Sequence, residues 1–117
     1  MDGHIVDIFY DGVFISGKGC TEKSYIGGKK VHFKVNIDKI QSCDAVIEGI
    51  KSILKDRMGN KEVVQIHFRK PNMSLAYRLQ LLYEGSLQKF IEILQKRQRI
   101  QLYIEHNTIP LKKIGPR

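Results

Sequence analysis

The sequence predicts an α+β fold in a single domain, and two kinds of periodicity support this. Several short segments alternate apolar and polar residues, which is the period-2 pattern of β-strands. Two other segments repeat apolar residues at spacings of three and four, which is typical of amphipathic helices. With 117 residues, 42% of them apolar, the chain has the size of one domain and can bury one core.

The first third of the chain predicts three strands. Residues 4–10 alternate with apolar side chains on both faces apart from Asp7, and Asp11-Gly12 is a turn signal that would return residues 13–15 as a hairpin. The glycine-rich stretch 16–28 predicts a loop. Residues 30–37 then predict a strand with an apolar face of Val31, Phe33, Val35 and Ile37 and a polar face of Lys30, His32, Lys34 and Asn36.

Two helices follow from capping signals and apolar stripes. The first is predicted to start after Ser42, which can cap it, and to stop at Gly59. Its apolar stripe consists of Cys43, Val46, Ile47, Ile50, Ile53 and Leu54. The second is predicted to begin with Ser86 as its cap, burying Leu87, Phe90, Ile91 and Leu94 and exposing Gln88, Lys89, Glu92, Gln95 and Lys96.

The remaining segments predict the rest of the sheet. Residues 63–68 and 99–106 are predicted strands. The segment 75–98 has two interpretations: residues 75–83 form a strand followed by a turn at Glu84-Gly85, or the segment is one interrupted helix. Hairpin, strand, helix, strand, strand, helix, strand is the order of a ubiquitin-like β-grasp, a mixed sheet of four or five strands with two helices on one face. The domain is expected to span residues 1–106, with 107–117 a loose basic tail.

Charge is distributed unevenly along the chain. The net charge is +8, and residues 61–117 carry eleven Lys and Arg against four acids, whereas residues 1–60 carry nine against eight. Such an excess suits an acidic protein surface or a nucleic-acid backbone, and a generally basic, solvated surface is the structural alternative. No apolar run has the length of a membrane span, and the amino-terminal stretch does not resemble a secretory signal, so an intracellular protein is expected.

Catalytic, metal and cofactor sites are not predicted. The two cysteines, Cys20 and Cys43, lack CxxC spacing, and Cys43 is expected to be a small core residue. His4, His32, His67 and His106 are scattered and expected at the surface, although His32 and His67 could approach each other across the sheet. The segments GKG and IGGKK lack the GxxxxGK[ST] spacing of a phosphate loop and favour turns. We therefore expect no enzyme and no small-molecule substrate.

Three stretches of the chain resemble the amino-terminal domain of plant Mutator-like (MuDR) transposases: YDGVF at 10–14, SYIGGK at 24–29 and LYIEH at 102–106. That domain is found in many short plant proteins and resembles the Phox-and-Bem (PB-one) interaction domain, a β-grasp. The resemblance covers residues 4–106, and SYIGGK is its most specific part. It implies a non-catalytic module, often nuclear, that joins one protein to another, and nothing in these residues corresponds to a transposase catalytic region.

Two features depart from the Phox-and-Bem pattern. The segment before the second helix, Tyr83-Glu84-Gly85, holds one acid, so an acidic docking face is not supported, and residues 4–10 lack the usual first-strand lysine. We therefore expect an acidic protein partner to dock on Lys29, Lys30 and Lys34, supported by Arg69 and Lys70, or to pair with a sheet edge. The alternative is phosphate-driven, weakly sequence-selective nucleic-acid binding.

Overall fold

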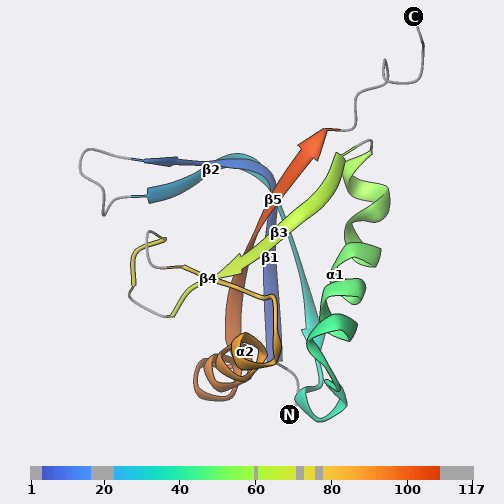
Figure 1. Cartoon of the computed structure of the whole chain (residues 1–117), viewed down its shortest axis with the longest axis vertical. Coiled ribbons are helices and arrows are strands. Elements are labelled where there is room, and N and C mark those ends of the chain that lie inside the picture. The colour runs from blue at the N-terminus through green and yellow to red at the C-terminus, as the bar shows by residue number, and fades with distance from the viewer. Residues whose placement is uncertain (1–3, 17–22, 60, 71–72, 76–77, 109–117) are drawn as a thin grey trace, which may run out of the picture.

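The computed structural model describes residues 4–16, 23–59, 61–70, 73–75 and 78–108, and confirms the α+β fold. A mixed five-stranded sheet has the order β2-β1-β5-β3-β4 (Figure 1). The strands are β1 (His4–Ser16), β2 (Lys23–Val35), β3 (Lys61–Phe68), β4 (Leu79–Gln80) and β5 (Arg99–Thr108). The helices are η1 (Ile37–Lys39), a short 3-10 turn, α1 (Cys43–Met58) and α2 (Glu84–Arg97). The central strands β1 and β5 run parallel, and the other pairs are antiparallel, as in a β-grasp.

Both helices pack against one face of the sheet. A single core cluster combines alternate residues of the strands with the apolar stripes of α1 and α2: Val6, Ile8, Tyr10, Ile66, Phe68, Ile100, Leu102 and Ile104 from the sheet, and Ile50, Leu54, Met58, Leu87, Phe90 and Leu94 from the helices. Cys43 belongs to this cluster with 2% of its surface exposed, as expected from sequence. Cys20 lies outside the described residues. We call the other face of the sheet the open face.

The first helix follows its sequence signals closely. Ser42 is the N-cap, and its Oγ accepts a hydrogen bond from the Ala45 amide at 3.1 Å. Gly59 ends the helix with a φ of 64°, which glycine adopts without the steric conflict of a Cβ. The amino end of α1 is also tied to α2, because the Cys43 amide donates to Glu84 Oε2 at 3.2 Å.

The second helix begins earlier than predicted. Glu84 and Gly85 form its first turn rather than a separate turn, and Tyr83 is the N-cap. Ser86 is the third helical residue, and its Oγ accepts from the amides of Leu82 and Tyr83 while donating to the Tyr83 carbonyl oxygen. The serine side chain thus fixes the backbone of the two residues that precede the helix. Ile93 is buried in this helix, and the predicted Ile91 is only half-buried.

The predicted early hairpin is wrong. The chain does not turn back at Asp11-Gly12: β1 continues through both residues to Ser16 and pairs over its length with β2. Residues 23–28, predicted as loop, are strand, and β2 ends at Val35, so that Ile37 falls in η1. The rest of the predicted loop, residues 17–22, lies outside the described residues.

Two later segments also differ from expectation. Between β3 and α2, only Leu79–Gln80 forms a strand, and residues 76–77 lie outside the described part, so neither predicted form of 75–83 is realised as a whole. The last strand reaches Thr108, two residues beyond the expected end of the domain. The expected tail from 109 onward lies outside the described residues. None of the helices described here is long and apolar enough to cross a membrane.

Candidate functional site

A kink in the β1–β2 ribbon shapes the open face. Asp11, Gly27 and Gly28 all have positive φ angles, of 64°, 70° and 83°. The pairing register stays constant across the kink, from Tyr10↔Lys29 to Gly12↔Gly27. Yet Tyr10 points into the helix-side core, whereas Phe14 contacts His67 and Tyr103 on the open face. The ribbon therefore bends as a unit, and its outer part points away from α1 (Figure 1).

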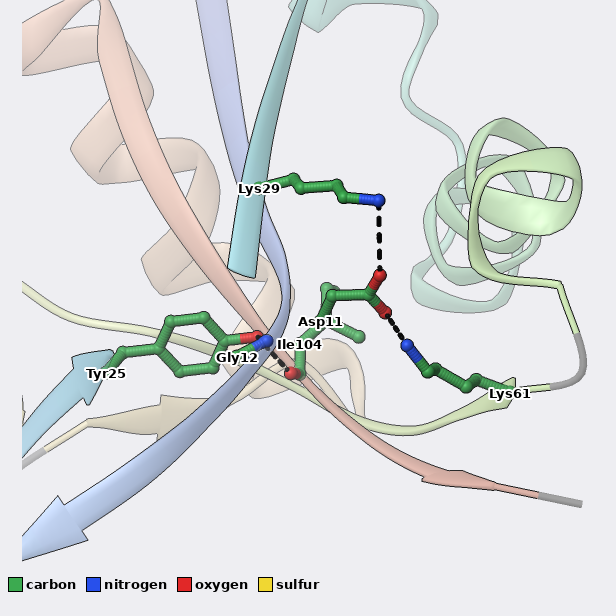
Figure 2. Close-up of polar contacts among 6 residues, drawn as sticks. All are labelled: Asp11, Gly12, Tyr25, Lys29, Lys61 and Ile104. Atoms are coloured by element: carbon green, nitrogen blue, oxygen red, sulfur yellow. Dashed lines mark hydrogen bonds and ion pairs between the residues drawn. The ribbon is translucent and has the colours of Figure 1, made fainter. Parts of the chain in front are cut away.

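Tyr25 links this kink by hydrogen bonds to the central strand β5. Its hydroxyl accepts a hydrogen bond from the Gly12 amide at 3.0 Å and donates to the Ile104 carbonyl oxygen of β5 at 2.8 Å (Figure 2). Burial raises the pKa of this hydroxyl, which keeps it protonated as a donor. A Cβ at Gly12 would lie 2.6 Å from the Tyr25 ring, so glycine is required for this approach.

Asp11 adds an electrostatic link at the same place. Its carboxylate lies 3.0 Å from Lys61 Nζ at the start of β3 and 3.9 Å from Lys29 Nζ on β2 (Figure 2). The most specific part of the sequence resemblance is SYIGGK. This segment supplies Tyr25 with its two hydrogen bonds, the two glycines of the kink and Lys29. Within this structure its role is to shape the ribbon.

Four aromatic side chains form an aromatic cluster on the open face: Phe9, Phe14, Tyr25 and Tyr103. Phe9 and Tyr103 stack with ring centroids 5.2 Å apart, while Tyr25 meets Phe14 and Tyr103 edge to face at 5.0 and 5.5 Å. Tyr103 is only 5% exposed. The rings face one another, so this cluster is a second, smaller core that holds the bent ribbon against β5.

Three cations lie over the outer faces of these rings. Arg78 stands 4.3 Å from the Phe14 centroid, Lys30 5.6 Å from that of Phe9, and Arg69 5.8 Å from that of Tyr103. Both arginines are also held by backbone carbonyl oxygens, since Arg69 donates to that of Met73 and Arg78 to that of Leu75. These hydrogen bonds hold the two guanidinium groups over the aromatic rings, while Lys30 contacts the Phe9 ring alone.

His67 lies beneath the aromatic cluster and was expected at the surface, which is wrong. It is 4% exposed, its Nε2 lies 2.9 Å from Glu105 Oε1, and its Nδ1 has no hydrogen-bond partner among the residues that the structure describes. Burial lowers the pKa of His67; the hydrogen bond to Glu105 opposes this and nearby Arg78 reinforces it. His32 is not close to it, because β1 and β5 separate their two strands.

We expect this histidine to make stability depend on pH. In the unfolded chain its pKa is near 6.5, so below that pH the unfolded state binds a proton that the folded state resists. The contribution of His67 to the free energy of unfolding should therefore be constant above pH 6.5. It should fall as the pH drops from 6.5 toward the lower pKa that His67 has in the folded state. Urea titrations at pH 7.5, 6.0 and 5.0 test this, with His67→Gln expected to flatten the decline. Equal declines in both proteins would contradict the assignment.

An ion pair closes the other end of the open face. Asp7 is fully buried, and Arg99, the first residue of β5, holds both its oxygens through Nε at 2.6 Å and Nη2 at 3.1 Å. This bond raises the pKa of Arg99. The sequence marks Asp7 as the one acid in an apolar strand but does not indicate its partner, which lies 92 residues away.

The five predicted site residues do not form one patch. In register, Lys30 lies beside Phe9 and Lys34 beside Ile5, so both share the open face with Arg69. Lys29 lies beside Tyr10 on the helix side and pairs with Asp11. Lys70 instead lines a hollow next to α2. Arg78 and Arg99, which sequence reasoning did not select, join the open face.

The described residues include no group of three or more His, Cys, Asp or Glu side chains placed to hold a metal ion. What the open face offers chemically is a set of ordered cations around packed aromatic rings. Comparison of the chain with family models, with curated proteins and with solved structures finds no match.

Proposed function

We propose that this chain is a non-catalytic interaction module that docks an acidic protein surface on its open face. The observation that carries the proposal is the placement of Lys30 and Arg69 over the rings of the aromatic cluster, with Lys34 on the same face. Aromatic and arginine side chains are enriched where protein interfaces are strongest. Cations already ordered on rings lose less conformational entropy when they bind.

The charge balance of this face favours a carboxylate-rich partner. Of the acids on this face, Asp7 is paired with Arg99, whereas Glu105 keeps its negative charge, because burial lowers the pKa of its neighbour His67 and leaves that ring neutral. Lys30 and Lys34, in contrast, are exposed and make no ion pair within the described residues. Complementary charge would steer an acidic partner to this face and exclude basic ones.

The resemblance to the amino-terminal domain of Mutator-like transposases supports the same proposal. It implies a protein-joining module that is often nuclear, and we propose the nucleus as its place of action. Pairing of an extended peptide with the outer edge of β2 is a further docking mode, because β2 is an end strand of the sheet. Lys30 and Lys34 lie on that same strand, so one acidic partner could use both.

Charge reversal on the open face tests the proposal. Peptides selected from a displayed random library should be rich in Asp and Glu, and Lys30→Glu/Lys34→Glu should weaken their binding by roughly tenfold or more. The control is Lys51→Glu/Lys55→Glu on α1, which changes the net charge equally and should leave affinity within about twofold. Titration calorimetry measures both. Equal losses in the two variants, or none in either, would rule out this face.

Nucleic-acid binding is the second candidate, favoured by the excess of cations in residues 61–117. Tyr25 and Tyr103 pack against each other, so their rings are not free to stack on bases, and contacts would be made to phosphates. Fluorescence anisotropy of a labelled random-sequence duplex at low and near-physiological salt separates the candidates. Micromolar binding with a steep salt slope supports nucleic acid, whereas no binding at low salt leaves the protein partner.

A further inference from the structure

A second basic surface lies away from the open face, beside α2. A hollow of about 440 Å³ is lined by Lys70, which follows β3, and by side chains of α2: Lys89, Glu92, Ile93, Gln95, Lys96 and Arg97. Lys89, Ile93, Lys96 and Arg97 follow at helical spacings, so one face of the helix forms one wall. Ile93 is 8% exposed and gives the hollow an apolar side.

Among the described residues, no carboxylate forms an ion pair with the cations around this α2 hollow. Within the part of the chain that the structure describes, the side chains of Lys70, Lys89, Lys96 and Arg97 take part in no ion pair or hydrogen bond. The favourable interaction with the carboxyl end of a helix accounts for Lys96 and Arg97 in the last turn of α2. It does not account for Lys89, which lies earlier in the helix, or for Lys70, which comes from another element.

A hollow of similar size elsewhere shows that this charge is not a general property of the surface. The hollow of about 500 Å³ between α1 and β3 also contains three lysines, Lys51, Lys55 and Lys61, but Glu48 and Glu62 line it as well. Lys61 is moreover paired with Asp11. The α2 hollow has four cations against the single carboxylate of Glu92.

We propose that the α2 hollow binds a compact anion carrying two or more phosphate groups. Several unpaired cations around a concave surface concentrate the positive potential and attract multiply charged anions. Each phosphate oxygen can accept a charge-assisted hydrogen bond from a lysine or arginine. A concave site closed on one side by a helix fits a small anion better than the long, convex backbone of a duplex.

The test uses inorganic tripolyphosphate as the probe and titration calorimetry with amide-shift mapping as the measurements. We expect saturable one-to-one binding, with shifts confined to α2 and the residues around Lys70. Lys89→Gln/Lys96→Gln should weaken the affinity by roughly tenfold or more, because two charge-assisted contacts are lost. The matched control, Lys51→Gln/Lys55→Gln, removes the same charge from α1 and should change the affinity for tripolyphosphate by less than about twofold.

A change of opposite sign completes the experiment. Glu92→Gln removes the one acid of the hollow and should strengthen tripolyphosphate binding, whereas Glu48→Gln on α1 should not. Equal effects of the α1 and α2 variants, or absence of saturable binding, would overturn the proposal. Tighter binding of a DNA duplex that is lost in the same Lys89/Lys96 variant would also overturn it, and would assign the hollow to a nucleic-acid backbone. None of these outcomes depends on the protein partner of the open face.

Discussion

Gly28→Ala should destabilise the protein by about 3 kcal/mol or more, because two independent penalties coincide at this position. The residue has a φ of 83°, a region that side chains with a Cβ rarely adopt. A Cβ would also lie 2.4 Å from the Tyr10 carbonyl oxygen and 2.7 Å from the Gly12 amide nitrogen, both of them backbone atoms of β1. Neither atom can move without opening the kink. Urea denaturation followed by circular dichroism measures the loss.

The neighbouring Gly27 provides the matched control. Its φ is 70°, but a Cβ there meets nothing within 4 Å. Gly27→Ala should therefore cost only the conformational penalty, about 1 to 2 kcal/mol. If the two alanine variants had equal free energies of unfolding, the inference of a steric clash at Gly28 would be wrong. A large loss at Gly28 would further predict weaker docking on the open face, since the kink places Phe14 and Tyr25 there.

Phe68→Ala should destabilise the protein by about 3 to 5 kcal/mol, the usual range for deleting a buried ring. Phe68 is 0% exposed on β3 and meets the Phe90 ring of α2 edge to face at 5.8 Å. Its removal opens a cavity where the sheet and α2 are in contact. Urea denaturation measures the change in the free energy of unfolding. An unchanged m-value would show that the variant exposes the same surface on unfolding, so that only its stability has changed.

Phe9→Ala is the control on the opposite face of the sheet. Phe9 is half-buried and stacks on Tyr103 under Lys30, so its removal should cost roughly half as much as that of Phe68. Phe9→Ala should also weaken binding of the acidic partner, because the Lys30 side chain loses the aromatic ring that it contacts. Equal destabilisation by the two substitutions would mean that the open face is as much a core as the helix side, and would argue against a docking role.

Local patterns were sufficient where the neighbours that decide a conformation are close in sequence. Ser42 and Gly59 bound α1 as expected, since capping depends on groups within three residues. The helical stripe of Leu87, Phe90 and Leu94 faces the core, as its spacing indicates. The alternation in β5 likewise placed Ile100, Leu102 and Ile104 inward.

Asp11-Gly12 forms a kink rather than the predicted turn for a physical reason. Asp-Gly favours positive φ at a tight turn, and Asp11 does adopt a φ of 64°. Here Gly27 and Gly28 across the ribbon also take positive φ, so both strands bend together and continue instead of reversing. A local signal predicts the unusual dihedral angle, but the partner strand decides whether it makes a turn or a kink.

The sequence by itself determined the α+β class, the two helices, their buried stripes and the basic excess of the second half, because these follow from period, capping and composition. Tertiary structure alone decided the open face and the α2 hollow. Tyr25 reaches Ile104 across 79 residues, and Asp7 reaches Arg99 across 92. Lys70 was grouped with Lys29 and Lys30 but lies beside α2. Such contacts depend on the order of strands in the sheet, which brings together side chains that no local pattern relates.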